Sequence, residues 1–273
     1  MPDSVSRFAG FADQYDAARP APPADLPAFL ADWSGRKAPD VVDIGAGSGL
    51  STMIWAGTAR QVTAVEPGAD MRAVLSRKVA SQAAGPTRFS VIGGTAEATG
   101  LDSESADIVT ASTAMHWFDH SQALPEIVRV LRPGGVLAAF GPTWPPRIDP
   151  EMDAAFEVFE ERMTGLEAER GLRPADSGDE HAAAMRSSGL FWHVDEVGMH
   201  GREEGDAGRV VGLARSRGGV AALLAAGATE DEVGITALAE VAARRLTAPR
   251  PWWWTFRVSL GVRQASTQRS PGR

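Results

Sequence analysis

Short apolar runs alternate with amphipathic stretches along the first 140 residues of the chain. The run DVVDI is rich in β-branched side chains and is followed by a glycine-rich turn, which is typical of a buried strand. The runs that predict strands lie at 40–44, 61–65, 89–94, 106–112 and 136–140. The stretches that predict helices lie at 24–34, 50–58, 69–83 and 121–131. Strands separated by helices pair in parallel through crossover connections, so this pattern predicts an α/β sheet.

The pattern changes after the fifth predicted strand. Residues 146–190 are charged and favour helix without a clear strand, and residues 206–246 are also helical. The alternating run at 191–200 predicts a sixth strand, and the run at 253–263 predicts a last one. We expect the charged helical segment to lie over the carboxyl edge of the sheet as a lid.

Composition narrows the class of protein. Hydrophobic residues make up 44% of the chain, enough for a substantial core, whereas a net charge of −8 argues against a nucleic-acid partner. The absence of Cys excludes disulfides and thiol chemistry. No segment reaches the ~20 apolar residues of a membrane span, and the N-terminal stretch lacks the apolar run of a signal peptide. We therefore expect a cytoplasmic protein without membrane or nucleic-acid partners, whose oligomeric state stays open.

The strongest chemical signal is the turn that follows the first predicted strand. Asp43 ends the strand, and Gly45, Gly47 and Gly49 follow it. Glycine permits positive φ and lets a ligand approach the main chain, whose N–H groups can then bind it. Alone, the turn is also compatible with an ordinary strand–helix connection, and its third glycine comes one residue too early for G-x-G-x-x-G. Glu66, at the tip of the second strand, adds a carboxylate that can accept both hydroxyls of a ribose.

Five sequence blocks resemble one known family. They cover residues 41–138 and read VVDIGAGSG, VTAVEPGADM, GGTAEATGL, ADIVTASTAMHWFD and VRVLRPGGVLA. In order and spacing they resemble the class I S-adenosylmethionine-dependent methyltransferases with the methyltransferase type 11 pattern. The opening FADQYDAARP, the run HWFD and the segment GLARSRGGVAALL are similar to the small-molecule subgroup of trans-aconitate methyltransferases.

The resemblance implies a fold, a cofactor and a division of the chain. The fold would be a Rossmann-like, doubly wound, mostly parallel seven-stranded sheet, the class I methyltransferase fold, with the helical lid between strands five and six. The cofactor would be S-adenosylmethionine. The implied divisions are an N-terminal cap at 1–35, a cofactor-binding core at 36–144, a helical lid or substrate insert at 145–190, the C-terminal part of the core at 191–263 and a disordered tail at 264–273.

The resemblance also implies cofactor contacts residue by residue. The glycine turn, with Ala46, would wrap the methionine part, Asp43 would hold its amino group or the loop, and Glu66 would bind the ribose diol. The residues implied beside the adenine are Pro67, Met71, Thr95, Ala96 and Glu97. Those implied near the amino-acid end are Ser112, Tyr15 and Arg19. Two positions depart from the family's pattern, because relatives commonly carry Gln at the place of Thr113 and many carry Asp at the place of Thr95.

Residues that act on the acceptor are less strongly specified. Methyl transfer from an activated sulfonium depends mainly on placement, and a base is needed only for a protonated nucleophile. His116 is the candidate base because imidazole titrates near neutrality, and a structural packing role is the alternative. Met115, Trp117 and Trp144 are the candidate substrate contacts, since ligand pockets are often apolar and aromatic. No carboxylate group has metal-site spacing, so we expect no metal.

These observations predict methyl transfer from S-adenosylmethionine to an oxygen, nitrogen or carbon nucleophile of a small molecule, including a secondary metabolite. One alternative is a cofactor-retaining protein that does not methylate, such as a cyclase or a binding module. Another is a nicotinamide oxidoreductase on a similar sheet, against which the early third glycine and the LRPGG block argue. A nucleic-acid methyltransferase is disfavoured by the charge.

Overall fold

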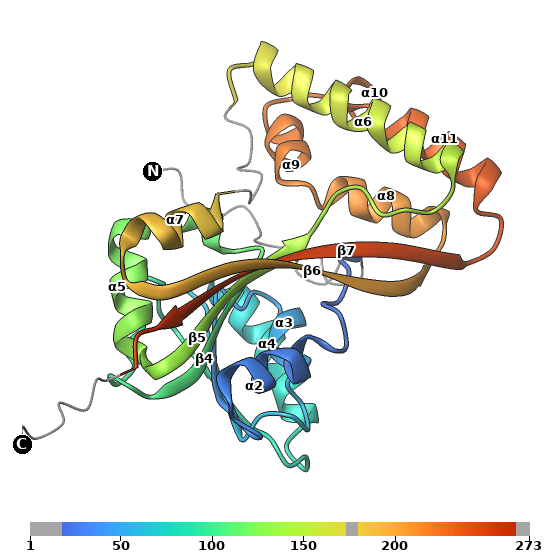
Figure 1. Ribbon diagram of the computed structural model, residues 1–273. Helices are drawn as coiled ribbons and strands as arrows, with labels where there is room; N and C mark the ends of the chain where they lie inside the picture. Colours follow the sequence, from blue (N-terminus) through green and yellow to red (C-terminus); the bar gives the residue numbers. More distant parts are fainter. Residues whose placement is uncertain (1–17, 173–179, 266–273) are drawn as a thin grey trace, which may run out of the picture.

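One seven-stranded sheet organises the computed structural model, which describes residues 18–172 and 180–265 (Figure 1). The strands follow the order β3-β2-β1-β4-β5-β7-β6. Their bounds are β1 Asp40–Ile44, β2 Gln61–Val65, β3 Arg88–Ile92, β4 Ala106–Ser112, β5 Leu131–Pro142, β6 Phe191–Gly205 and β7 Arg250–Arg263. β7 runs antiparallel to β5 and β6, whereas the other neighbours are parallel. The predicted Rossmann-like, mostly parallel seven-stranded sheet is confirmed.

Helices cover both faces of the parallel part of the sheet (Figure 1). On one face lie α2 (Leu26–Ser34), α3 (Leu50–Met53) and α4 (Ala69–Ser81), and on the other lie α5 (His120–Val130) and α7 (His181–Ser188). β1 is buried along its whole length, because Val41 packs in a core with Leu30 and Val42 packs in a second core with Ile127. This two-sided burial explains why the strand is continuously apolar rather than alternating.

β6 and β7 extend beyond the parallel part and carry a second group of helices (Figure 1). We call this group the helical cluster. It comprises α6 (Pro150–Glu169), α8 (Ala207–Arg215), α9 (Gly218–Ala225), α10 (Glu230–Val233) and α11 (Ile235–Arg245). Trp252, Trp254 and Phe256 of β7 are buried in the same core as the apolar residues of these helices. Alternate strand residues point to opposite faces, so Trp253 is 55% exposed.

The segment expected to form a lid divides between the two parts. α6 packs against α9, α10 and α11, whereas α7 packs against α5 and the strands β6 and β7. The helical cluster is therefore assembled from residues before β6 and from residues between β6 and β7.

Several element bounds differ from those predicted. β5 begins at Leu131, β6 continues to Gly205 and β7 begins at Arg250, so each of these strands is longer than its apolar run. The helix predicted at 50–58 is limited to Leu50–Met53, and the helical stretch at 206–246 consists of α8 to α11. Pairing with a neighbouring strand extends polar ends that periodicity does not mark. Within the described residues, no helix has both the length and the apolar character to cross a membrane.

Candidate functional site

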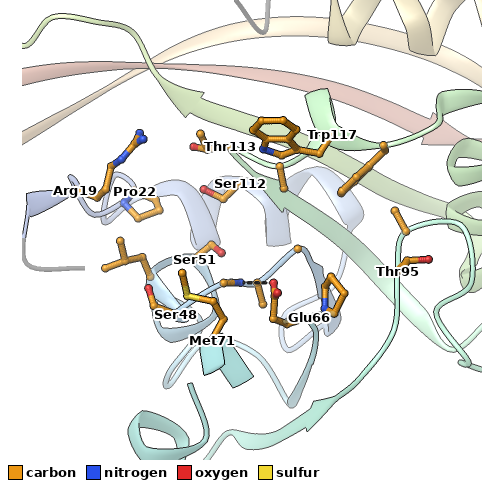
Figure 2. A pocket seen from close by; sticks show the side chains of 18 of the residues that line it. Arg19, Pro22, Ser48, Ser51, Glu66, Met71, Thr95, Ser112, Thr113 and Trp117 are labelled. Carbon is orange, nitrogen blue, oxygen red and sulfur yellow. Dashed lines mark hydrogen bonds between the residues drawn. The ribbon is translucent and has the colours of Figure 1, made fainter. Parts of the chain in front are cut away.

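A cavity of about 250 Å³ opens at the carboxyl ends of the parallel strands (Figure 2). The predicted site residues that line it are Arg19, Gly45, Ala46, Gly47, Glu66, Pro67, Met71, Thr95, Ala96, Glu97, Ser112 and Trp117. They come from the segment before α2, from the turns after β1, β2, β3 and β4, from the end of β4 and from the first turn of α4. Ligands of open α/β sheets bind at this edge, where the strand order reverses, so the topology itself brings these residues together.

The glycine turn after β1 depends on positive φ and on close neighbours. Gly45, Gly47 and Gly49 have φ of 68°, 55° and 94°. A Cβ on Gly45 would lie 2.7 Å from the Cβ of Ala114, so no side chain fits there. A Cβ on Gly47 would meet nothing within 4 Å, and this residue borders the cavity, so a ligand can reach its backbone. Gly49 is outside the lining and is the N-cap residue of α3.

The carboxylate of Glu66 is fixed at the tip of β2. Its Oε2 accepts the N–H of Gly47 at 2.9 Å (Figure 2). Its Oε1 accepts the N–H of Gly68 at 2.7 Å. The residue is only 8% exposed, yet it borders the cavity. Each carboxylate oxygen has two acceptor sites, so Glu66 keeps acceptors for the hydroxyl groups of a ligand.

Asp43 lies beneath the glycine turn rather than in the cavity lining. Its Oδ2 accepts the hydroxyls of Ser51 and Thr52 at 2.7 and 2.6 Å, and its Oδ1 accepts that of Thr110 at 2.8 Å. Burial raises the pKa of Asp43, while the hydrogen bonds from these hydroxyls oppose the rise. The carboxylate links β1, α3 and β4, and of its two expected roles this geometry fits the support of the loop.

The other end of the cavity contains an unusual backbone conformation. Figure 2 shows Thr113 close to Ser112 and Trp117 in that view. Thr113 has φ of 50°, which is uncommon for a β-branched residue, and its N–H donates to the carbonyl oxygen of Phe140 at 2.8 Å. Such backbone outliers gather at functional sites, and this one borders the cavity.

The other predicted site residues that the structure describes do not border the cavity. Tyr15 lies outside the described residues. Met115 is buried, and His116 packs against Trp117 with ring centroids 4.7 Å apart; neither borders the cavity, and Trp144 does not border it either. The geometry therefore gives no support to His116 as a base. In the described ranges, no group of three or more His, Cys, Asp or Glu residues could hold a metal ion.

Sequence reasoning missed part of the lining. Ser48 belongs to the glycine turn, and Leu50 and Ser51 begin α3 directly after it, so all three could have been found from that motif. Pro142 and Phe256 come from β5 and β7. No local motif predicts that these two strands pair, so no sequence pattern indicates that the two residues lie together at the cavity. The other missed residues are Pro20, Pro22, Gly94, Thr113, Ala114 and Phe118.

Comparison with known proteins identifies what this chain is similar to. Residues 42–139 match the methyltransferase domain family. An uncharacterized methyltransferase of Mycobacterium tuberculosis is 36% identical over 135 residues, which are 50% of this chain and 51% of the relative. The trans-aconitate 2-methyltransferase of Deinococcus radiodurans is 35% identical over 126 residues, which are 46% of this chain and 45% of that protein. The chain therefore spans about half the length of the curated relatives it matches.

A solved structure extends the likeness to most of the chain. It was described as a candidate type II methyltransferase from Anaeromyxobacter dehalogenans. The similarity covers 90% of this chain and 99% of the other, with 25% sequence identity and a TM-score of 0.68. The likeness therefore reaches well beyond the residues 42–139 that match the family.

Proposed function

We propose, from the match of residues 42–139 to the methyltransferase domain family, that the protein transfers the methyl group of S-adenosylmethionine to an oxygen, nitrogen or carbon nucleophile of a small molecule. One observation carries the proposal. The carboxylate of Glu66 is held by the N–H groups of Gly47 and Gly68 at the cavity edge, next to a glycine turn with an accessible backbone. This arrangement is suited to a nucleoside with a free ribose diol.

The chemistry of the lining fits each part of this cofactor. Glu66 would accept hydrogen bonds from the two ribose hydroxyls. Pro67 and Met71 offer an apolar flank for the adenine. The accessible backbone of Gly47 suits the methionine part, and the guanidinium of Arg19 suits its carboxylate.

The bound cofactor would supply a methyl group already activated on a sulfonium. The protein's residues then have to orient the acceptor and exclude water, which is how placement lowers the barrier. Trp117 and Phe118 supply apolar surface at the cavity, and Thr113 supplies a hydroxyl. The described lining contains no His, which suits an acceptor whose nucleophile is already unprotonated.

A small-molecule acceptor is supported by the size of the cavity and by the net charge of −8, which does not attract nucleic acid. The name of the relative from Deinococcus radiodurans gives a concrete candidate, because trans-aconitate is a small polycarboxylate. We include it among the first acceptors to be tried.

The proposal is tested by incubating the purified protein with S-adenosylmethionine and a panel of small acids, amines and phenols. Chromatography should detect S-adenosylhomocysteine that forms only when an acceptor is present. A folded protein that binds neither S-adenosylmethionine nor S-adenosylhomocysteine at millimolar concentration would contradict the proposal.

A further inference from the structure

Trp144 connects the cofactor cavity to the helical cluster. The Cζ of Arg19, a cavity residue, lies 5.5 Å from the centroid of its ring, and the Cζ of Arg217 lies 4.7 Å from it. The indole of Trp254 packs edge-on against that of Trp144, with ring centroids 5.6 Å apart. Arg19 also donates from Nη2 to the carbonyl oxygen of Ser216 at 2.9 Å, so the α8–α9 junction reaches the edge of the cavity.

Three buried polar atoms around Trp144 have no hydrogen-bond partner among the described residues. They are Nε of Arg217, Nε1 of Trp254 and Oε1 of Glu160. Folded proteins pair the great majority of such atoms, so a group of them points to a polar ligand. Two of the three are N–H donors, one of them on a cation, which favours a ligand with negatively charged acceptor atoms.

Arg217 keeps donors available although it forms an ion pair. Its Nη2 contacts Oε2 of Glu160 at 2.5 Å, and a guanidinium has five N–H donors in all. Glu167, on the same helix as Glu160, is also buried, and burial raises the pKa of its carboxyl, which favours the neutral form. Glu160, which pairs directly with Arg217, is the counter-charge that a ligand of Arg217 would have to displace.

We infer that Arg217, Trp254 and Trp144 form an acceptor subsite, and that Arg217 selects acceptors that carry a carboxylate. The carboxylate would accept from Nε of Arg217 and from Nε1 of Trp254, which would anchor one end of the acceptor beside the cavity. This inference rests on the proposed function and adds the acceptor class and its specificity-determining residue. Arg217 lies in the segment GLARSRGGVAALL, whose resemblance to the subgroup assigns no role to any of its residues.

Calorimetric titration of the full chain, saturated with S-adenosylhomocysteine, tests the subsite with probes of matched shape. Cinnamate and glutarate should bind at least tenfold more tightly than cinnamamide and glutaramide. Arg217→Gln should weaken the carboxylates at least tenfold. Trp254→Phe removes the indole donor together with part of the buried ring, and it should weaken them severalfold. Arg215→Gln is the matched control. Arg215 lies two positions before Arg217 but forms an exposed ion pair with Glu230, so its replacement should leave binding unchanged.

Glu160→Gln provides a test with the opposite sign. Removing this charge frees Arg217, so the carboxylates should bind severalfold more tightly, whereas a purely structural ion pair would give losses in both variants. The inference is overturned if wild type binds neither carboxylate at millimolar concentration, if the amides bind equally well, or if Arg217→Gln binds like wild type. Loss of S-adenosylhomocysteine binding in wild type would instead contradict the proposed function.

Discussion

The parallel part of the sheet and the β6–β7 extension assemble their polar residues in different ways. In the parallel part, Gly45 follows β1 directly, Glu66 follows β2 directly and Ser112 ends β4. In the extension, Arg19 meets Ser216 across 197 positions of sequence. The carboxyl ends of parallel strands collect local motifs at one edge, whereas an antiparallel extension covered by helices collects isolated residues from distant segments. Variants in the parallel part should therefore lose stability or cofactor binding, whereas variants in the extension should leave cofactor binding nearly intact.

Replacing Asp43 should cause the largest loss of stability in the parallel part. Asp43→Ala leaves the buried hydroxyls of Ser51, Thr52 and Thr110 without their acceptor, at about 1–3 kcal/mol for each unsatisfied group before relaxation. We expect the free energy of unfolding in urea to fall by ~3–5 kcal/mol. Asp43→Asn, which retains an acceptor oxygen, should lose less. The exposed Asp70, replaced by Ala, is the control, and a loss below that control's would contradict the supporting role of Asp43.

Two glycines with matched φ separate backbone strain from steric contact. Gly35 and Gly45 have φ of 66° and 68°, but only Gly45 has a neighbour that a Cβ would overlap, Ala114 at 2.7 Å. Gly35→Ala should cost ~1 kcal/mol from the left-handed backbone, and Gly45→Ala should cost ~2–4 kcal/mol. Gly45→Ala should also weaken S-adenosylhomocysteine binding. Equal costs in thermal unfolding would show that the turn tolerates a side chain.

The contribution of the extension can be measured with Trp144→Leu, by unfolding and by S-adenosylhomocysteine calorimetry. The variant removes two cation–π contacts, with Arg19 and Arg217, and should lower the free energy of unfolding by ~1–2 kcal/mol. Calorimetry should find S-adenosylhomocysteine affinity within about threefold of wild type, because Arg19 is the one proposed cofactor contact that Trp144 meets, whereas Glu66 and the glycine turn lie in the parallel part. If Trp144→Leu lowered S-adenosylhomocysteine affinity as much as Gly45→Ala does, the extension would contribute to cofactor binding as strongly as the parallel part, which would contradict this comparison.

Glu126 should give the smallest effect, and one that depends on pH. Hydrogen bonding from Arg129, together with Thr99, lowers the pKa of Glu126 to about 2 from an ordinary 4.5. A depressed pKa contributes stability that is present above pH 4.5 and is lost as the pH falls toward 2. Glu126→Gln should be less stable by ~1 kcal/mol at pH 7, since the pair is partly screened by solvent. In unfolding measurements across pH, a difference that persists at pH 2 would contradict this origin.

The sequence predicts the parallel part better than the extension for a physical reason. The DVVDI run and the glycines at 45, 47 and 49 act through neighbours in the chain, so their strand, turn and cavity position follow from local rules. Phe256 and Arg217 have no such local signal, since their positions depend on the pairing of β7 and on the packing of α9. The same limit explains why the segment before β6 was expected to be a single lid although α6 and α7 pack in different places.

Calorimetric titration of S-adenosylhomocysteine into wild type and Glu66→Ala tests the central claim most directly. Glu66→Ala removes the acceptor held between Gly47 and Gly68, and the loss of charged hydrogen bonds to a ribose diol should weaken binding by about 10- to 100-fold. Thermal unfolding should verify that the variant is folded, and Asp70→Ala should bind like wild type. Equal affinity in Glu66→Ala and wild type would contradict the assignment of this cavity to the cofactor.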